Sequence, residues 1–279
     1  MKNFTAVTGI GILLFLSCNT PEKETQPQDS TAKKPADTVA ITGDNIVKSE
    51  APDASTKMDQ GYGLSRHSNE MAQSPINIVS LDATNDKTKT IAIKFKADIT
   101  VAENLGHTIQ LDFKDGSTTI VDGKNYAAKQ FHFHTPSEHL IDGMTFPMEM
   151  HIVNILKDSG EKTNPSYLVI GVLFKMGKEN KFIQEFLNDV PAEEHQKDSL
   201  SPGTANFQDL SSQILGNANT SYFTYKGSLT TPPFTERVEW IVLKQILEAS
   251  PDQILAIEKM EGNNARHVQA LNDRKVLSH

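Results

Sequence analysis

The sequence contains a single cysteine, Cys18, among 279 residues, so no disulfide bond can form within the chain. It also lacks an excess of basic residues. Lys and Arg number 27 against 35 Asp and Glu, and the net charge of -8 argues against nucleic acid as the main partner, because phosphate binding needs a basic face. The apolar run at residues 10–16 is shorter than the ~20 residues of a membrane-spanning helix. A hydrophobic content of 37% fits a soluble globular protein.

The N-terminal residues resemble an export signal of the bacterial lipoprotein type. Lys2 supplies the positive charge, residues 10–16 supply the apolar run, and the small Ser17 precedes Cys18. We therefore expect residues 1–18 to be a signal peptide with a lipobox-like end. The mature chain would then be exported to a bacterial periplasm or cell envelope and anchored in a membrane through a lipid on Cys18. The alternative is an ordinary secretory signal that happens to end near a cysteine.

Residues 19–57 are rich in Pro, Lys, Glu, Asp, Ser and Thr and contain almost no aromatic residues. Such a segment cannot bury enough apolar surface to offset the entropy lost on ordering. We interpret it as a flexible polar tether, with a protein-binding arm as the alternative. No second change in composition follows, so residues 58–279 are predicted to form one domain.

Strand patterns dominate this domain. Apolar and polar residues alternate over 91–96, 107–113, 130–134, 149–155 and 238–243, and residues 167–174 form a continuous apolar run typical of a strand buried on both faces. Helices are fewer: one is predicted within 178–190, and one begins at Ser250 with Pro251 and Gln253 in capping positions. The expected fold is predominantly β (mixed α/β), a central twisted, mostly antiparallel sheet with a few peripheral helices.

Histidines mark the candidate metal site. Alternate side chains of a strand share a face, so His132 and His134 point the same way while Phe131 and Phe133 point the other. A further strand pattern carries His151, which a neighbouring strand could bring beside the pair. Three neutral imidazoles leave one tetrahedral position of zinc open, the arrangement of a catalytic and not a structural site. A His-x-His pair alone is weak support, because surface strands carry such pairs by chance.

Two polar residues strengthen this interpretation. Gln130 and Glu149 each precede a proposed ligand by two residues and so share its strand face. Each could accept the second ring N–H of a histidine and fix the tautomer and orientation of that ring. The sequence therefore predicts two ligand histidines held by neighbours on their own strands.

Several segments together resemble the α-class carbonic anhydrases, from about residue 61 to the C-terminus. They are residues 73–78 (QSPINI), 104–107 (NLGH), 130–139 (QFHFHTPSEH), 149–153 (EMHIV), 222–240 with GSLTTPP at its centre, and 263–266 (NNAR). The resemblance implies a largely antiparallel twisted sheet with one zinc ion at the bottom of a cone-shaped cleft. It also implies a carbonate dehydratase, a zinc lyase that reversibly hydrates carbon dioxide to bicarbonate and a proton by attack of zinc-bound hydroxide.

The roles implied by the resemblance can be assigned position by position. His132, His134 and His151 match the zinc ligands, and Gln130 and Glu149 match their hydrogen-bond partners. Thr230 matches the hydroxyl that accepts the proton of the zinc-bound hydroxide, Glu138 the carboxylate behind it, and His107 the proton shuttle. The apolar wall for carbon dioxide is matched by Val153, Val169, Leu229, Val238 and Trp240. Thr231 matches a threonine near bicarbonate, and Tyr62 matches a tyrosine of the cleft water network.

The match is weaker in two places. Few residues separate Tyr62 from Gln73, where members of the family usually have a longer aromatic stretch, and Phe234 stands where secreted bacterial members often have a disulfide-bonded cysteine. Two other functions remain open. A non-catalytic binding module on the same fold would be expected to have lost a ligand histidine. A dedicated zinc esterase would need a site shaped for an acyl group, and no insertion supplies one.

Overall fold

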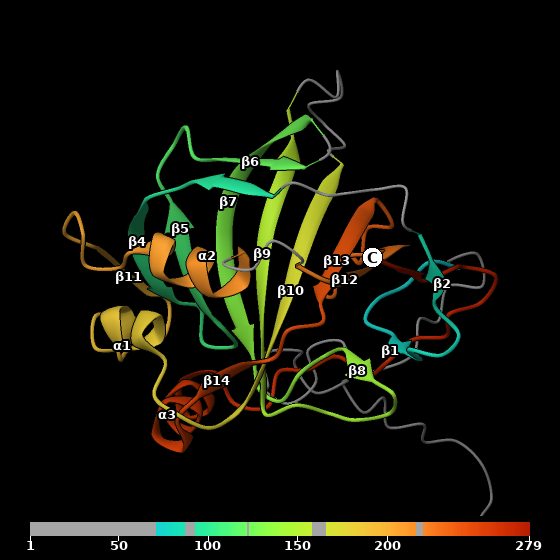
Figure 1. Cartoon of the computed structure of the whole chain (residues 1–279). Helices are drawn as coiled ribbons and strands as arrows, with labels where there is room; N and C mark the ends of the chain where they lie inside the picture. Colours follow the sequence, from blue (N-terminus) through green and yellow to red (C-terminus); the bar gives the residue numbers. More distant parts are fainter. Residues whose placement is uncertain (1–70, 87–92, 122, 158–165, 216–219) are drawn as a thin grey trace, which may run out of the picture. The chain divides into compact units, whose positions relative to one another are not determined.

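One large mixed sheet organises the chain (Figure 1). The computed structural model describes residues 71–86, 93–121, 123–157, 166–215 and 220–279. The order of the main strands in the sheet is β11 (Gln196–Ser199), β4 (Ile99–Asn104), β5 (Ile109–Phe113), β7 (Lys124–His134), β9 (Met148–Leu156), β10 (Tyr167–Met176), β13 (Val238–Leu243), β12 (Tyr222–Gly227), β15 (Leu277–Ser278) and β2 (Thr84–Asn85).

Short strands complete the architecture. β6 (Thr118–Val121) pairs with both β7 and β3 (Lys94–Lys96), and β14 (Leu247–Ala249) pairs with β10. β1 (Asn77–Ile78) and β8 (Leu140–Ile141) form a separate parallel pair. The run from β11 through β10 is antiparallel, whereas β10 and β13 are parallel. The predicted fold class, a mostly antiparallel twisted sheet with few helices, is therefore confirmed.

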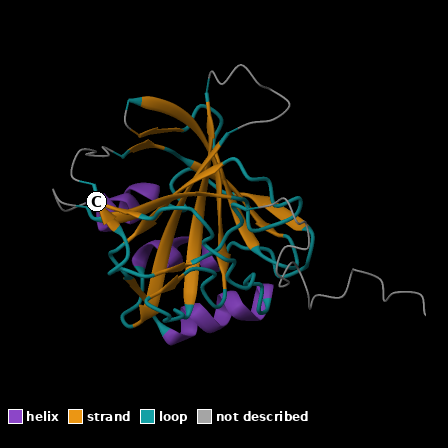
Figure 2. Cartoon of the chain, turned by 90° about the vertical axis from the view of Figure 1, so that its right-hand side faces the viewer, coloured by secondary structure: helices purple, strands orange, loops and turns teal. Residues whose placement is uncertain are grey.

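The two faces of β7 differ as the alternation predicts. Phe131 and Phe133 are fully buried in the larger apolar core. That core includes Phe182 of α1 (Lys181–Leu187) and Phe207 of α2 (Phe207–Leu215), whose ring centroids lie 5.6 and 6.1 Å from that of Phe131. Figures 1 and 2 show these helices on one side of the sheet. The histidines of β7 therefore face the side that these two helices leave free.

A second apolar cluster lies on the histidine side of the sheet. Strand β10 contributes to both clusters: Leu168, Ile170 and Val172 belong to the larger core, and Val169 and Leu173 belong to the second. The continuous apolar run at residues 167–174 is thus explained, because both faces of this strand are buried.

The third helix, α3 (Pro251–Glu261), begins as predicted. Ser250 accepts from the Gln253 backbone N–H, and the Gln253 side chain accepts from the Ser250 N–H, which completes a capping box. Helix α1 lies within the predicted 178–190, whereas α2 was not predicted. None of the helices in the described ranges has the length and apolar character needed to cross a membrane.

The described residues all belong to one compact unit, Ala51–His279. The expected signal peptide with Cys18, the expected tether and Tyr62 lie outside the described residues, so the proposed domain boundaries stay predictions.

Candidate metal centre

Antiparallel pairing of β7 and β9 brings three histidines together. His132 lies directly opposite His151, and His134 follows two residues later on the same face of β7. The ring centroids lie 5.0 Å apart for His132 and His134, 5.3 Å for His132 and His151, and 4.5 Å for His134 and His151. One ring nitrogen from each lies within 4.8 Å of the others, so these residues could hold one metal ion.

Neighbouring side chains fix which nitrogen of two rings faces this centre. The Oε1 atom of Gln130 lies 2.9 Å from Nδ1 of His132, and an amide oxygen can only accept, so Nδ1 carries the proton and Nε2 keeps its lone pair. Oε1 of Glu149 likewise lies 2.9 Å from Nε2 of His151, which leaves Nδ1 as the lone-pair nitrogen. These are the contacts expected from the strand faces, and their role at a bound metal stays a prediction.

The third ring provides a direct test of whether a metal fits. His134 is only 2% exposed, and neither of its ring nitrogens makes a hydrogen bond of standard geometry to the described residues, although the Asn264 backbone lies near enough to the ring to raise its pKa. Buried polar atoms without partners are rare because each costs free energy. A cation bound at Nε2 of His134 would satisfy one of them. The donor set of three imidazoles is also the one found at catalytic zinc.

The electrostatics keep the three rings neutral. Burial lowers the pKa of His132 to about 3, helped by positive charge on His151 and His107, although Glu149 opposes the shift. Burial also holds the pKa of His134 well below its usual value and lowers that of His151, despite the raising effect of Glu149 on both. Neutral imidazole is the form that binds a metal ion, so the site has its ligands ready at neutral pH.

Glu149 holds two histidines at once. Its Oε1 lies 2.9 Å from Nε2 of His151 and 2.7 Å from Nδ1 of His139, while its Oε2 accepts the backbone N–H groups of Glu138 and His139. Burial by itself raises the pKa of Glu149, but the histidines outweigh it and lower this pKa well below its usual range. His139 in turn is fully buried and lies 2.6 Å from the Tyr225 hydroxyl, so its ring is held between Glu149 and Tyr225.

Glu138 lies on the other side of the histidines. Its Oε2 is 3.6 Å from Nε2 of His134 and 3.8 Å from Nδ1 of His151, and its Oε1 accepts the Arg266 backbone N–H at 2.9 Å. Burial raises the pKa of Glu138 well above its usual value, opposed by hydrogen bonds from the Thr230 side chain and the Arg266 backbone. The structure thus brings Thr230 and Glu138 together, as the resemblance implied.

His107 lies in the turn between β4 and β5. Its ring is half-buried, and Nδ1 lies 3.1 Å from the Leu105 carbonyl oxygen, which can only accept. Nδ1–H therefore donates to this carbonyl, and Nε2 keeps its lone pair. The charge of His107 is close enough to His132 to lower the pKa of that ring.

The five residues assigned to the apolar wall lie in the second apolar cluster. Val153, Val169 and Trp240 occupy matching positions on β9, β10 and β13, so they form one row across the sheet. Val238 is buried at the start of β13, and Leu229 packs against the cluster while partly exposed. Thr231 is exposed, next to the buried Thr230.

Sequence reasoning gave no role to two residues that organise the site. Arg266 fixes Glu138 through its backbone, and Asn264 accepts from the Thr135 N–H at 3.0 Å and donates to the His107 carbonyl at 2.8 Å. Arg266 is 128 positions from Glu138 in the sequence, and Asn264 is 129 positions from Thr135. Their only signal in the sequence was that they form part of a segment resembling the family.

Comparisons with known proteins agree with this geometry. A family model described as eukaryotic-type carbonic anhydrase matches residues 62–279. A carbonic anhydrase of Neisseria gonorrhoeae is 36% identical over 208 residues, which are 74% of this chain and 76% of that protein. The α-carbonic anhydrase of Thermovibrio ammonificans, solved with the inhibitor sulfanilamide, matches with a TM-score of 0.66 at 38% identity, over 74% of this chain and 87% of that one.

One similar protein is not named a carbonic anhydrase. Dioscorin DB3L of Dioscorea polystachya is 30% identical over 221 residues, which cover 75% of this chain and 76% of that protein. The family model nevertheless spans most of the chain, including all three histidines and the Thr230 segment. The chain therefore belongs to the eukaryotic-type carbonic anhydrase family.

Proposed function

We propose that this chain catalyses the reversible hydration of carbon dioxide to bicarbonate and a proton, with one zinc ion held by His132, His134 and His151. The observation that carries the proposal is the buried group of three neutral imidazoles, two of them held by Gln130 and Glu149 with one lone pair directed at a common point. Zinc held by three histidines would lower the pKa of a bound water molecule to about 7 and so would supply a nucleophile near neutral pH.

Thr230 and Glu138 select and aim this nucleophile. When the Thr230 hydroxyl donates to the carboxylate of Glu138, its oxygen has only lone pairs left for other partners. It can then accept a hydrogen bond from an O–H group but cannot donate one. A nucleophile with one O–H is thus held with a lone pair turned towards the substrate. The backbone N–H of Arg266 keeps Glu138 in place.

The apolar row of Val153, Val169 and Trp240 suits the substrate. Carbon dioxide is uncharged and nonpolar, so an apolar surface beside the metal centre can hold it without ordering water around it. Trp240 lies next to the metal ligands, since its ring centroid is 4.8 Å from that of His151. Bicarbonate is an anion, and the same surface does not favour its retention.

His107 receives the proton that the reaction releases. Its Nδ1–H is held by the Leu105 carbonyl, which leaves Nε2 as the acceptor, and the half-buried ring is close enough to His132 for its charge to lower the pKa of that ring. A histidine side chain can both take up and release a proton, which a proton shuttle requires.

The direct test is carbon dioxide hydration by the purified chain, followed by stopped flow with a pH indicator. Metal is removed with a chelator and zinc is then restored. We expect hydration only with zinc, its loss in His134→Ala and its inhibition by a sulfonamide. The exposed His267→Ala serves as the matched control and should keep full activity. A folded, zinc-loaded chain without hydration would rule out this function and favour the binding-module alternative, whereas weak ester hydrolysis alone would not distinguish an esterase.

We also propose that the chain is exported and anchored through a lipid on Cys18, with residues 19–57 as the tether. The support is the sequence pattern around the only cysteine of the chain. Cells that express the chain should incorporate radiolabelled palmitate into it, and Cys18→Ala should abolish the label. If the unaltered chain takes up no label, its N-terminus is a plain signal peptide.

A further inference from the structure

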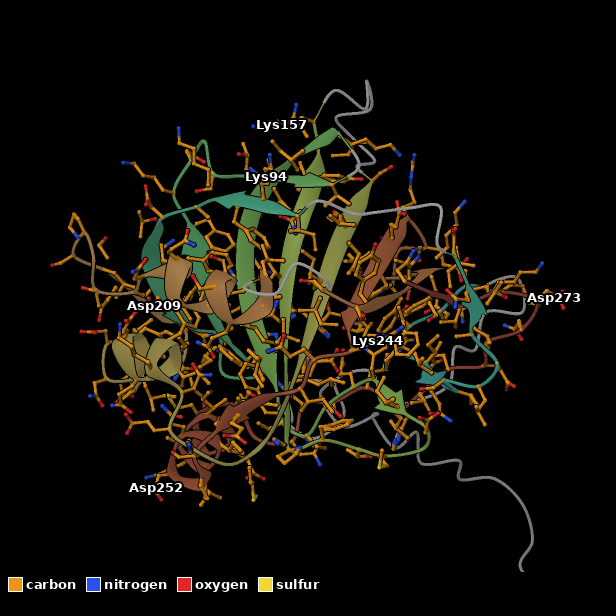
Figure 3. All side chains as sticks on the ribbon, in the orientation of Figure 1. Lys94, Lys157, Asp209, Lys244, Asp252 and Asp273 are labelled. Atoms are coloured by element: carbon orange, nitrogen blue, oxygen red, sulfur yellow. The ribbon has the colours of Figure 1, made fainter. Side chains whose placement is uncertain are left out.

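A buried carboxyl group that this reaction does not use lies at the end of α3. Glu261, the last residue of the helix, is 5% exposed, and within the described ranges no cation forms an ion pair with it. At the opposite end of the same helix, Asp252 points outward (Figure 3). A fully buried acid without a cationic partner is rare in proteins and invites a functional explanation.

The contacts of Glu261 join two segments of the candidate site. Oε1 lies 3.0 Å from the hydroxyl of Thr135, the residue directly after His134. Oε2 lies 3.5 Å from the hydroxyl of Thr108, the residue directly after His107, and 3.4 Å from the backbone N–H of Ile109. One carboxyl group therefore touches both the end of the metal-binding strand and the turn that carries His107.

The hydroxyl groups of Thr135 and Thr108 each face a backbone carbonyl as well as Glu261. The Thr135 hydroxyl also faces the Gly262 carbonyl at 3.0 Å, and the Thr108 hydroxyl faces the Phe133 carbonyl at 2.8 Å. Each hydroxyl has one proton and donates it to one acceptor at a time. If both donate to the carbonyls, a protonated Glu261 can complete the network by donating to a hydroxyl. Burial raises the pKa of Glu261 to about 8, opposed by its hydrogen bonds with Thr135, Ile109 and Thr108.

Asn264 connects the same two segments three residues later. Its side-chain amide donates to the carbonyls of His107 and Phe133, at 2.8 and 3.1 Å, and its oxygen accepts the Thr135 N–H at 3.0 Å. The segment from Glu261 to Asn264 thus forms a polar clasp between the His107 turn and the end of β7. Gly106 in that turn has a φ of 79°, which few other residues adopt, so the turn itself has one preferred shape.

We propose that Glu261 is a positioning residue that holds the His107 turn at a fixed place beside His134 for proton transfer. The proposal rests on the function proposed above, in which His107 is the proton shuttle. Proton transfer depends steeply on distance and alignment, and a displacement of about 1 Å can cost about 100-fold in rate. Glu261 touches no reacting atom, so it acts through Thr108, Ile109 and Thr135.

Three variants separate positioning from general stability. Glu261→Met fills similar space but removes both polar atoms, Glu261→Gln keeps a donor and an acceptor, and the exposed Glu258→Gln on the same helix is the matched control. In weak buffer, Glu261→Met should lower kcat about 10-fold and leave kcat/KM within about twofold, because only the proton-transfer step is affected. Imidazole buffer should restore its kcat. Glu261→Gln and Glu258→Gln should stay near the original rate.

A second measurement does not depend on activity. NMR of the purified chain should show faster amide exchange at Ile109 and shifted His107 ring signals in Glu261→Met, and neither change in Glu258→Gln. Unchanged kcat and unchanged NMR signals in Glu261→Met would overturn the proposal. So would an equal fall of kcat and kcat/KM with unmoved His107 signals, since Glu261 would then act on the metal site. If the unaltered chain hydrates no carbon dioxide, the proposed function fails, and the NMR comparison alone decides whether Glu261 positions the turn.

Discussion

At the candidate metal centre, the absence of a side chain at Gly171 leaves room for the carboxylate of Glu149. Gly171 of β10 is paired with His151 of β9, and a Cβ atom at this glycine would lie 2.8 Å from Oε1 of Glu149. Real Cβ atoms do not come so close to an oxygen, so Glu149 occupies the space that the glycine leaves open. The same oxygen holds the rings of both His139 and His151.

Gly171→Ala should therefore weaken zinc binding without unfolding the chain. The added methyl group displaces Glu149, and His151 loses the acceptor that fixes its ring. Loss of such a partner typically reduces metal affinity 10- to 100-fold. Competition with a chromophoric chelator measures the affinity. Val172→Ala is the control, because Val172 is buried in the core on the other face of the strand. It should lower the melting temperature and leave zinc affinity unchanged, and the reverse pattern would contradict this account of Gly171.

The protonation of Glu261 gives a second expectation at the residue scale. The folded chain keeps the proton on this carboxyl up to about pH 8, whereas an unfolded glutamate loses it above about 4.5. Unfolding therefore releases a proton in this window, and the group destabilises the fold by up to about 1.4 kcal/mol for each pH unit of rise. Below pH 4.5 and above pH 8 its contribution no longer changes.

Glu261→Gln has no such proton to release. The difference in free energy of unfolding between the variant and the original chain should grow in favour of the variant from pH 4.5 to pH 8 and then level off. Urea unfolding at several pH values measures this difference, and other titrating groups cancel in the comparison. A difference that stays constant with pH would show that Glu261 is already ionised in the folded chain.

At the scale of elements, the sequence could predict the strand faces and helix starts that depend on residues close together along the chain. The alternation at residues 130–134 predicted both faces of β7, and the pattern at residues 250–253 predicted the start of α3. Helix α2 was missed although Phe207, Leu210 and Ile214 are buried along one of its faces, because nine residues with four apolar positions are too short a stretch to establish a helical period. The parallel pairing of β10 with β13 depends on a long crossover, so no local pattern reveals it.

In the candidate site, too, contacts within one strand could be predicted from the sequence, whereas contacts between distant segments could not. Gln130 and Glu149 were predicted as partners of His132 and His151 because each pair lies on one strand face. The bond from Arg266 to Glu138 joins residues 128 positions apart, and the clasp of Glu261 joins α3 to β5 and β7. Such contacts depend on how elements pack, and only resemblance to a family could have suggested them.

The two ends of α3 should act independently. Ser250 caps the N-terminus, whereas Glu261 and Asn264 hold the site at the other end of the helix. Ser250→Ala removes the cap and should lower the free energy of unfolding by about 0.5–2 kcal/mol while leaving carbon dioxide hydration unchanged. Thermal unfolding and stopped flow measure the two quantities. Ser212→Ala, at an exposed position of α2, is the control and should change neither. A loss of hydration in Ser250→Ala would mean that the whole helix controls the site.

At the scale of the whole molecule, the chain must be stabilised without a disulfide. Phe234 stands where the resemblance to secreted bacterial members of the family would place a cysteine, and its ring centroid lies 3.8 Å from the guanidinium carbon of Arg266. Arg266 also donates to the Gln73 side chain and to the Ser74 carbonyl. Stacking and hydrogen bonds thus tie the loop of Thr230 to the N-terminal part of the described chain, where a covalent bond is absent.

Zinc should supply a further part of this stability. The three proposed ligands come from two strands and converge only in the folded chain, so the ion would bind the folded state and not the unfolded one. Free zinc at 100 times its dissociation constant then stabilises the fold by about 2.7 kcal/mol. We expect a melting temperature that rises with zinc concentration and falls after chelation, measured by calorimetry at pH 7. In His134→Ala the rise should be largely lost, while His267→Ala should respond like the original chain. Equal shifts in all three proteins would mean that zinc binds outside the three-histidine site.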